Sequence, residues 1–286
     1  KMPQETNLNV SPYYDDFDPA SNFHRVLFKP GTPVQARELT GLQSILQDQI
    51  EKFGTHFFKE GAKVIPGQLF YQDVFTGVCI DPDFAGLPVS LYIDELVGKR
   101  FRGEDSGIEA KIELILRAED SELSFNTLYF SITKSGVDYS SGDFIEGENL
   151  ILLDSLSYGN TSIPVNQGFA RALSTNCNIT GSAANIQDGV YFLRGNFVSV
   201  DAQTVLLQQY EAMPTVRVGL SVIEEIISAD DDQSLNDNAQ GFSNYSAPGA
   251  DRLKITANLT TKLIADNDDP DFVELMRIQD GELETF

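Results

Sequence analysis

The segment FKPGTPVQARELTGLQSILQDQIEKFG, residues 28–54, carries the one long helical pattern of this sequence. Its apolar residues recur at steps of three and four, which is the spacing of side chains on one face of an α-helix. This apolar stripe consists of Leu39, Leu42, Leu46, Ile50 and Phe53, and Val34 and Ile45 widen it. The segment therefore predicts one long amphipathic helix, whereas most of the sequence after it has the pattern of strands and turns.

The ends of this helix also have sequence signals. Thr32 precedes Pro33, and Gln35 follows three residues after Thr32. This is the order of a capping box with proline in the first helical position, where its missing N–H is not needed. Gly54 favours a stop at the other end. The pattern predicts a docking helix over residues 32–54.

The two faces of the helix predict two environments. The polar face carries Gln43, Gln47, Asp48, Gln49, Glu51 and Lys52. The apolar stripe fits a coiled-coil seam over only about two heptads, which is too short to specify a coiled coil. Two interpretations stay open: the stripe packs on the chain's own β core, or on a helix of another subunit. We expect the stripe to be buried, and Gln43 and Gln47 to bind a neighbouring subunit as uncharged hydrogen-bonding groups.

Composition excludes several classes of partner. The chain has 286 residues, of which 41% are apolar, as in a globular protein with a sizeable core. Its 43 acidic and 20 basic residues give a net charge of −23, which repels nucleic-acid backbones and anionic membranes. No apolar run approaches the roughly 18 residues of a membrane-spanning helix. We therefore expect no nucleic-acid partner and no membrane insertion.

The cysteines and the chain ends support further expectations. Cys79 and Cys177 lack the spacing of metal ligands, which predicts two buried free thiols in a protein assembled under reducing conditions. The first residues lack a basic head followed by an apolar core, so we expect no secretory signal. The start at Lys1 and the end at Phe286, which has no stop signal, leave open a native chain that extends further.

The rest of the chain divides into segments of different character. Residues 1–31 mix prolines, aspartates and aromatics, which predicts an extended arm with Tyr13, Tyr14 and Phe17 as apolar anchors. Because such an arm has little core of its own, we expect it to lie on a neighbouring subunit or on its own body. Residues 55–89 and 156–286 predict a β scaffold domain.

Residues 90–155 predict a small β-barrel or sandwich inserted into this scaffold and separable from it. SLYIDEL, IEAKIELILRA, TLYFSIT and FIEGENLILL have strand patterns, and GKRFRGEDSG, EDSELSFN and KSGVDYSSGD have the composition of turns. Outside this block, RGN at 194–196 predicts a hairpin turn, and 216–227 and 252–264 predict long strands. The fold class is therefore mainly β, built from sandwich or barrel modules, with an extended arm and one long helix.

The sequence offers little catalytic chemistry. It contains two histidines, His24 and His56, and no zinc, nucleophile-elbow or phosphate-loop motif. A pair of carboxylates for glycan cleavage needs no fixed spacing, but the chain has no tryptophan on which sugars stack. The acidic loop at 229–241 lacks the glycine that a calcium loop requires. We expect no catalytic residue, no metal, no cofactor and no small-molecule substrate.

A resemblance rests on ETNLNVSPYYDDFDPASNFHRVLFKPGTPVQARELTGLQSILQDQIEKFG and on FKEGAKVIPG, residues 5–54 and 58–67. It resumes in DGVYFLRGNFVSVDAQTVLLQQY, RVGLSVIEEII and SLNDNAQGFSNYSAPGADRLKI, so that about half the chain takes part. These segments resemble a family of virion proteins of contractile-tailed bacteriophages, including phages of cyanobacteria. The block at 90–155 lies outside the resemblance, which agrees with an insertion.

The resemblance implies a non-enzymatic structural protein of the phage tail, in particular of its baseplate. Its partners would be other tail and baseplate proteins and copies of itself, in an oligomeric virion assembly put together in the host cytoplasm. The alternative is a receptor-binding or tail-fibre protein that contacts the host surface, although the repeats typical of fibres are weak here. An enzyme is the third class. The resemblance implies no catalytic residue.

Overall fold

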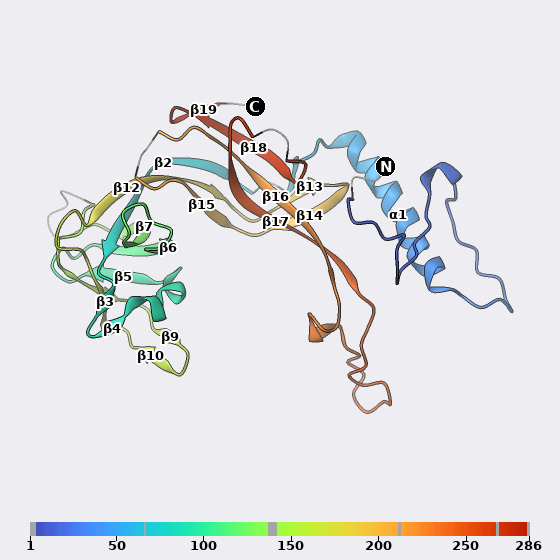
Figure 1. Cartoon of the computed structure of the whole chain (residues 1–286), viewed down its shortest axis with the longest axis horizontal. Helices are drawn as coiled ribbons and strands as arrows, with labels where there is room; N and C mark the ends of the chain where they lie inside the picture. Colours follow the sequence, from blue (N-terminus) through green and yellow to red (C-terminus); the bar gives the residue numbers. More distant parts are fainter. Residues whose placement is uncertain (1–3, 66, 137–141, 211–212, 267–268, 285–286) are drawn as a thin grey trace. The chain divides into compact units, whose positions relative to one another are not determined.

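A computed structural model describes residues 4–65, 67–136, 142–210, 213–266 and 269–284 (Figure 1). The chain is mainly β, as the sequence predicts, and α1 (Ala36–Phe57) is the one α-helix among these residues. The chain forms two compact units. The first holds the chain up to Gln68, with Ile186–Gln203 and Val218–Leu275, and the second holds Leu69–Asn185, Thr204–Arg217 and the chain from Met276 onward.

The first unit contains a three-stranded sheet in the order β1 (Lys63–Ile65), β13 (Gly189–Leu193) and β14 (Asn196–Val200). β13 and β14 form an antiparallel hairpin. The two residues between them, Arg194 and Gly195, have φ angles of 49° and 76°. A two-residue hairpin turn of type I′ requires positive φ at both positions. This confirms the turn that RGN predicts.

A four-stranded sheet has the order β17 (Arg252–Leu263), β16 (Val216–Ile227), β18 (Phe272–Gln279) and β19 (Glu282–Glu284). β16 and β17 confirm the two long strands predicted from the sequence. Along β17, Ala257 and Leu259 are buried and their neighbour Asn258 is exposed, as the alternating pattern of a half-buried strand requires.

The second unit is built around an eight-stranded sheet in the order β11-β8-β5-β6-β7-β2-β12-β15. Its strands are β2 (Leu69–Ile80), β5 (Arg100–Gly103), β6 (Glu109–Leu116), β7 (Asn126–Lys134), β8 (Asn149–Leu152), β11 (Gly168–Arg171), β12 (Asn178–Ile186) and β15 (Gln203–Gln208). Two short hairpins accompany it, namely β3 (Asp83–Phe84) with β4 (Leu87–Pro88), and β9 (Leu156–Tyr158) with β10 (Thr161–Ile163).

Part of this sheet closes into a barrel. β2 pairs with β7 along one edge. Along its other edge, the Asp81 N–H donates to the Arg171 carbonyl at 2.9 Å and the Leu173 N–H donates to the Cys79 carbonyl at 3.0 Å. The chain after β11 therefore returns to β2, and the strands from β11 through β8, β5, β6 and β7 to β2 form a closed ring. Closure removes the unpaired edges of these strands.

Aromatic side chains fill the barrel. Phe101 and Phe144 stack with ring centroids 5.2 Å apart, and Phe130 meets Phe144 edge to face at 5.1 Å. Phe169 completes the cluster from β11, in a T-shaped contact with Phe101 at 6.0 Å. Such pairs add to the free energy gained from burial alone. Cys79 and Cys177 are buried free thiols, as predicted.

The block at 90–155 does not have the boundaries expected from the sequence. The compact unit that contains it starts at Leu69 and includes β11 and β12. SLYIDEL forms two short 3-10 turns, Val89–Leu91 and Ile93–Leu96, instead of a strand, and the expected turn GKRFRGEDSG contains β5. Burial explains both differences, because Ile93, Leu96 and Phe101 all reach the barrel core.

We expect that replacing residues 90–155 with a short Gly-Ser linker abolishes the cooperative unfolding of the second unit. The change removes β5 to β8 and leaves the remaining core side chains, such as Phe169, exposed to water. Calorimetry and near-ultraviolet circular dichroism measure this. A deletion variant that keeps one sharp transition for the remainder would show that the block is a separable insertion after all.

Candidate functional site

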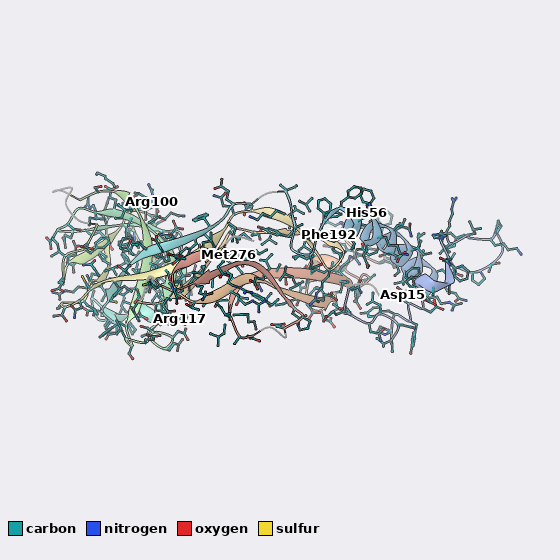
Figure 2. The ribbon with its side chains drawn as sticks, turned by 90° about the horizontal axis from the view of Figure 1, so that it is seen from above. Asp15, His56, Arg100, Arg117, Phe192 and Met276 are labelled. Atoms are coloured by element: carbon teal, nitrogen blue, oxygen red, sulfur yellow. The ribbon has the colours of Figure 1, made fainter. Side chains whose placement is uncertain are left out.

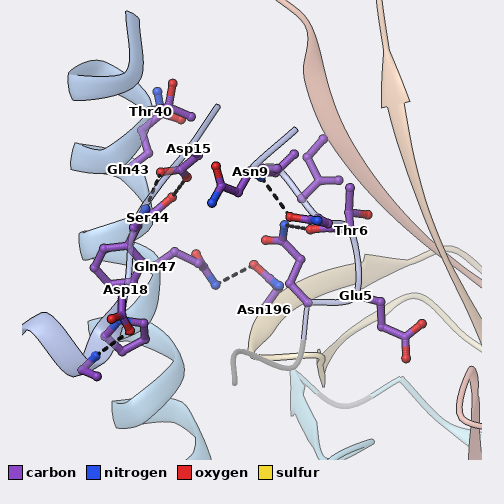
Figure 3. Close-up of a pocket in the computed structure, with 17 residues that line it drawn as sticks. Glu5, Thr6, Asn9, Asp15, Asp18, Thr40, Gln43, Ser44, Gln47 and Asn196 are labelled. Carbon is purple, nitrogen blue, oxygen red and sulfur yellow. Dashed lines mark hydrogen bonds between the residues drawn. The ribbon is translucent and has the colours of Figure 1, made fainter. Parts of the chain in front are cut away.

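The helix α1 contacts its own unit through its polar face. Ser44 and Asp48 are 9% and 5% exposed. The Ser44 hydroxyl donates a hydrogen bond to the carboxylate of Asp15 in the arm. The Gln47 amide donates to the Asn196 side-chain oxygen at 2.7 Å and to the Gly195 carbonyl at 3.1 Å (Figure 3). Hydrogen bonds to the arm and to the β13–β14 turn therefore hold this face.

The apolar stripe is exposed to solvent on the other side of the helix. The exposed fractions are 51% for Leu39, 57% for Leu46, 44% for Ile50, 63% for Phe53 and 64% for Phe57. Leu42 is half-buried, and Ile45 is the apolar side chain of α1 that is buried. Of the two interpretations of the stripe, packing on the chain's own β core is therefore wrong. Contact with another subunit stays a prediction.

Both ends of α1 differ from the predicted 32–54. Gln35 caps the helix, and its N–H donates to the Glu38 carboxylate at 3.0 Å, so Thr32 and Pro33 precede the helix. The helix passes Gly54 and ends at Phe57. Gly54 has a different role from a stop signal, as its surroundings show.

An aromatic cluster fastens the C-terminal end of α1 to the three-stranded sheet. A Cβ atom at Gly54 would lie 2.4 Å from the Phe192 ring, so only glycine permits this approach. Phe58 contacts Phe192 at 5.9 Å and Phe197 at 5.8 Å between ring centroids. Phe192 lies beside the end of the helix that carries His56 (Figure 2).

The arm is clasped onto the first unit by hydrogen bonds. The Thr6 N–H and hydroxyl donate to the Glu224 carboxylate at 2.8 and 2.6 Å. The Tyr13 hydroxyl donates to the Asp251 carboxylate at 2.5 Å, and Arg37 pairs with Asp16 at 3.0 Å. The sequence predicts that the arm lies on a neighbouring subunit or on its own body. These hydrogen bonds show that its own body contacts it, and contact with a neighbouring subunit stays a prediction.

The three aromatic anchors predicted for the arm have different surroundings. Tyr13 and Phe17 are half-buried, whereas Tyr14 is 58% exposed. Tyr13 and Phe17 therefore serve the clasp within this chain. Tyr14 is exposed, as are most side chains of the α1 stripe, and it does not help to hold the arm in this way.

A buried ion pair underlies the clasp. The side chains of Arg194 and Glu224 are 8% and 3% exposed and lie 2.9 Å apart, and Arg194 also binds Asp271. Burial raises the pKa of Glu224, but hydrogen bonds from Thr6, Glu5 and Arg194 outweigh burial and leave the pKa below its ordinary value of 4.5. Sequence reasoning missed this pair, because its members are far apart in the chain. One signal in the sequence could have indicated this pair: Arg194 occupies a turn position that favours Asn or Gly.

A polar cavity of about 960 Å³ lies between the arm and α1 (Figure 3). Amides from Asn7, Asn9, Gln43, Gln47 and Asn196 line it, with carboxylates from Glu5, Asp15 and Asp18. Each carboxylate has a partner, Glu5 with Arg194, Asp15 with Ser44 and Asp18 with the Ala20 N–H, and neither histidine is among the lining residues. The cavity can hydrogen-bond polar groups, but it holds no nucleophile beside a histidine base.

The predicted interface residues of α1 thus fall into three groups. Leu39, Leu46, Ile50 and Phe53 share one exposed face with the half-buried Leu42, and Phe57, which sequence reasoning missed, extends it. Gln47 is used inside the unit, and Gln43 is exposed at the cavity. The described residues hold no group of three His, Cys, Asp or Glu side chains placed to bind a metal ion.

The comparisons with known proteins place the chain in one family. The model of a family described as a domain of unknown function, DUF4815, matches residues 11–81 and 135–285. These segments are more than half of the chain, and the chain therefore belongs to this family. Searches of curated proteins and of solved structures each find no match. Among the described residues, no helix is both long enough and apolar enough to cross a membrane.

We expect Gly54→Ala to destabilise the protein by about 1–3 kcal/mol, because the added methyl displaces the Phe192 ring from a packed site. Gly41→Ala in the same helix is the matched control. Its Cβ would meet only Asp15 at 3.9 Å, so the gain in helix propensity, up to about 1 kcal/mol, should dominate. Urea unfolding measures both, and equal effects of the two variants would contradict the packing role of Gly54.

We expect Glu224→Gln to destabilise the protein at pH 7 by about 3 kcal/mol, because it breaks a buried pair with Arg194. Glu225→Gln is the control, since Glu225 pairs with Lys254 at the surface and should lose less than about 1 kcal/mol. Because the folded-state pKa of Glu224 is lowered, its contribution is present above pH 4.5 and is lost as the pH falls through the lowered pKa. Unfolding curves from pH 7 to pH 3 should therefore converge for wild type and Glu224→Gln, and parallel curves would contradict this.

Proposed function

We propose that this chain is a non-enzymatic structural component of a bacteriophage tail, in particular of its baseplate, and that it acts by binding neighbouring subunits. One observation carries the proposal: α1 is held to its own unit through its polar face, and its apolar face is exposed. A monomeric protein rarely leaves a row of large apolar side chains in water, and such surfaces mark sites of protein association. The resemblance of residues 5–54 to tail proteins supports the same function.

The size of the apolar face determines how strongly it can bind a partner. Its five exposed side chains are each roughly half exposed. Full burial of one such side chain from water is worth roughly 1.5–3 kcal/mol, so covering the remaining half of five gives about 5 kcal/mol. Association costs an estimated 4–15 kcal/mol of lost freedom. The face therefore binds weakly alone and strongly when other contacts hold the subunits together, as in a virion assembled in the host cytoplasm.

The partners follow from charge and chemistry. A net charge of −23 disfavours nucleic acid and anionic membranes. The partners are other tail and baseplate proteins and copies of this chain, with no cofactor, metal or small-molecule substrate. The protein acts in fixed numbers within an oligomeric assembly rather than by turnover.

A second candidate function is a receptor-binding or fibre protein, and one segment favours it. The loop between β16 and β17 carries Phe242 and Tyr245, which are 74% and 50% exposed. The Asp237 N–H donates to the Ala247 carbonyl and the Ser246 N–H donates to the Asp237 carbonyl, each at 2.9 Å, and these two bonds close the loop. It projects from the two strands (Figure 1) and could contact a surface. Electron microscopy of virions that carry a labelled copy separates the two functions by the position of the label.

We expect Leu46→Asp to fold with an unchanged melting temperature and to enter tails at least tenfold less than wild type. Leu46 is 57% exposed, so the charge is harmless until a partner covers it, when an unpaired buried charge becomes costly. Leu123→Asp is the control, because Leu123 is 48% exposed in a turn of the second unit. Incorporation is measured by complementing a phage that lacks the gene. Equal incorporation of all three proteins would refute subunit binding through this face, and failure of the wild type to enter tails would refute a place in the tail.

A further inference from the structure

The exposed face of α1 has an order that is symmetric about its middle. Its members, from the N-terminal to the C-terminal end, are Leu39, Leu42, Leu46, Ile50, Phe53 and Phe57. Leu46 and Ile50 lie two residues to either side of Asp48, and Leu39 and Phe57 lie nine residues to either side. Leu42 and Phe53 lie six and five residues away. A face with this symmetry can pair with itself when one copy is reversed.

We infer that this face binds the same face of a second copy of the chain, as an antiparallel helix pair whose two-fold axis crosses the face between Leu46 and Ile50, level with residue 48. The inference rests on the proposed role of α1 in subunit binding and names its partner. A two-fold interface is isologous, so each contact between two different residues occurs twice. Here Leu39 meets Phe57 of the other copy, Leu42 meets Phe53, and Leu46 meets Ile50.

Side-chain size favours the reversed direction over a parallel one. The N-terminal half of the face is leucine, and the C-terminal half ends in two phenylalanines whose rings already touch, with centroids 4.9 Å apart. A parallel pair would place these rings on each other and leucine on leucine, which leaves uneven space. An antiparallel pair places aromatic on aliphatic side chains along its length and also opposes the two helix dipoles favourably.

The periodicity of the face fits a straight partner of the same length. Its steps of 3, 4, 4, 3 and 4 residues cover 18 residues in five turns, which is the 3.6-residue repeat of an unsupercoiled helix. The helix has 22 residues and is therefore about 33 Å long. A second α1 supplies an apolar row of this length and straightness.

The charges beside the face are complementary under the same symmetry. Residues 18 apart lie on the same side of an α-helix, so Glu38 and His56 share one edge of the face. The two-fold axis brings Glu38 of one copy beside His56 of the other, where a carboxylate and an imidazole can pair. The six apolar positions themselves carry no charge, so the face adds nothing to the repulsion between two chains of net charge −23. Added salt, which screens that repulsion, should strengthen the pair.

Disulfide trapping between different variants tests the direction of the pair. Leu42→Cys and Phe53→Cys are purified separately, then oxidised alone and as an equimolar mixture. The native Cys79 and Cys177 are 1% and 0% exposed and do not take part. We expect a disulfide-linked dimer in the mixture and little in either variant alone. Leu123→Cys mixed with Phe53→Cys is the matched control and should give none.

Each other outcome overturns the inference. Dimers formed by either variant alone would show a parallel or unspecific contact, and no dimer in the mixture would show that the faces do not meet. Light scattering of the wild type and of Leu46→Asp gives an independent measurement, with at least a tenfold weaker dimer expected for the variant. If the mixture gives no disulfide-linked dimer and Leu46→Asp still fails to enter tails, the face binds a different subunit: this inference fails and the proposed function stands. If Leu46→Asp enters tails normally, the proposed binding of subunits through this face fails as well.

Discussion

The attachment of α1 to its own unit by polar contacts determines which face of the helix stays exposed. Ser44 binds Asp15, Gln47 binds Asn196, and Gly54 receives the Phe192 ring. A helix that used its leucines for this attachment would be more strongly fixed and would present a polar surface to other proteins. Here hydrogen bonds and one aromatic contact position the helix, and its apolar side chains stay exposed.

The arm also takes part in positioning α1. The arm that brings Asp15 to Ser44 is also bound at Glu224 and Asp251. Buried polar groups are stable when all of them are paired, and the removal of one leaves the others unsatisfied. The position of α1 is therefore coupled through the arm to the Arg194–Glu224 pair in the β sheets. A change at this pair should be felt at the helix, although its members do not touch the exposed face.

The sequence predicts what short-range chemistry controls. The long strands β16 and β17 and the two-residue turn at Arg194–Gly195 were confirmed, because strand and turn patterns are local. The apolar stripe of α1 identified the side chains that avoid water, but periodicity does not say whether the chain's own body or a partner covers them. The sequence predicts a stop at Gly54, because glycine often ends a helix. The actual reason for glycine is its contact with Phe192, which lies over 130 positions away and leaves no local pattern. The sequence predicts a turn where β5 lies, because glycine and charged residues surround Phe101, whose burial depends on the closed barrel.

The family match covers some structural parts of the chain and leaves others out. All of α1, most of the arm and the β13–β14 turn lie within the matched residues, whereas β5, β6 and β7 lie in the unmatched stretch between 81 and 135. The parts that position the exposed face of α1 are therefore those by which the family is defined, and the middle of the barrel is not. Under the proposed function this separation is expected, because a surface that binds partners must keep its shape while a module outside it is free to differ. The exposed leucines and phenylalanines of α1 are then the part of the matched segment that would contact a partner.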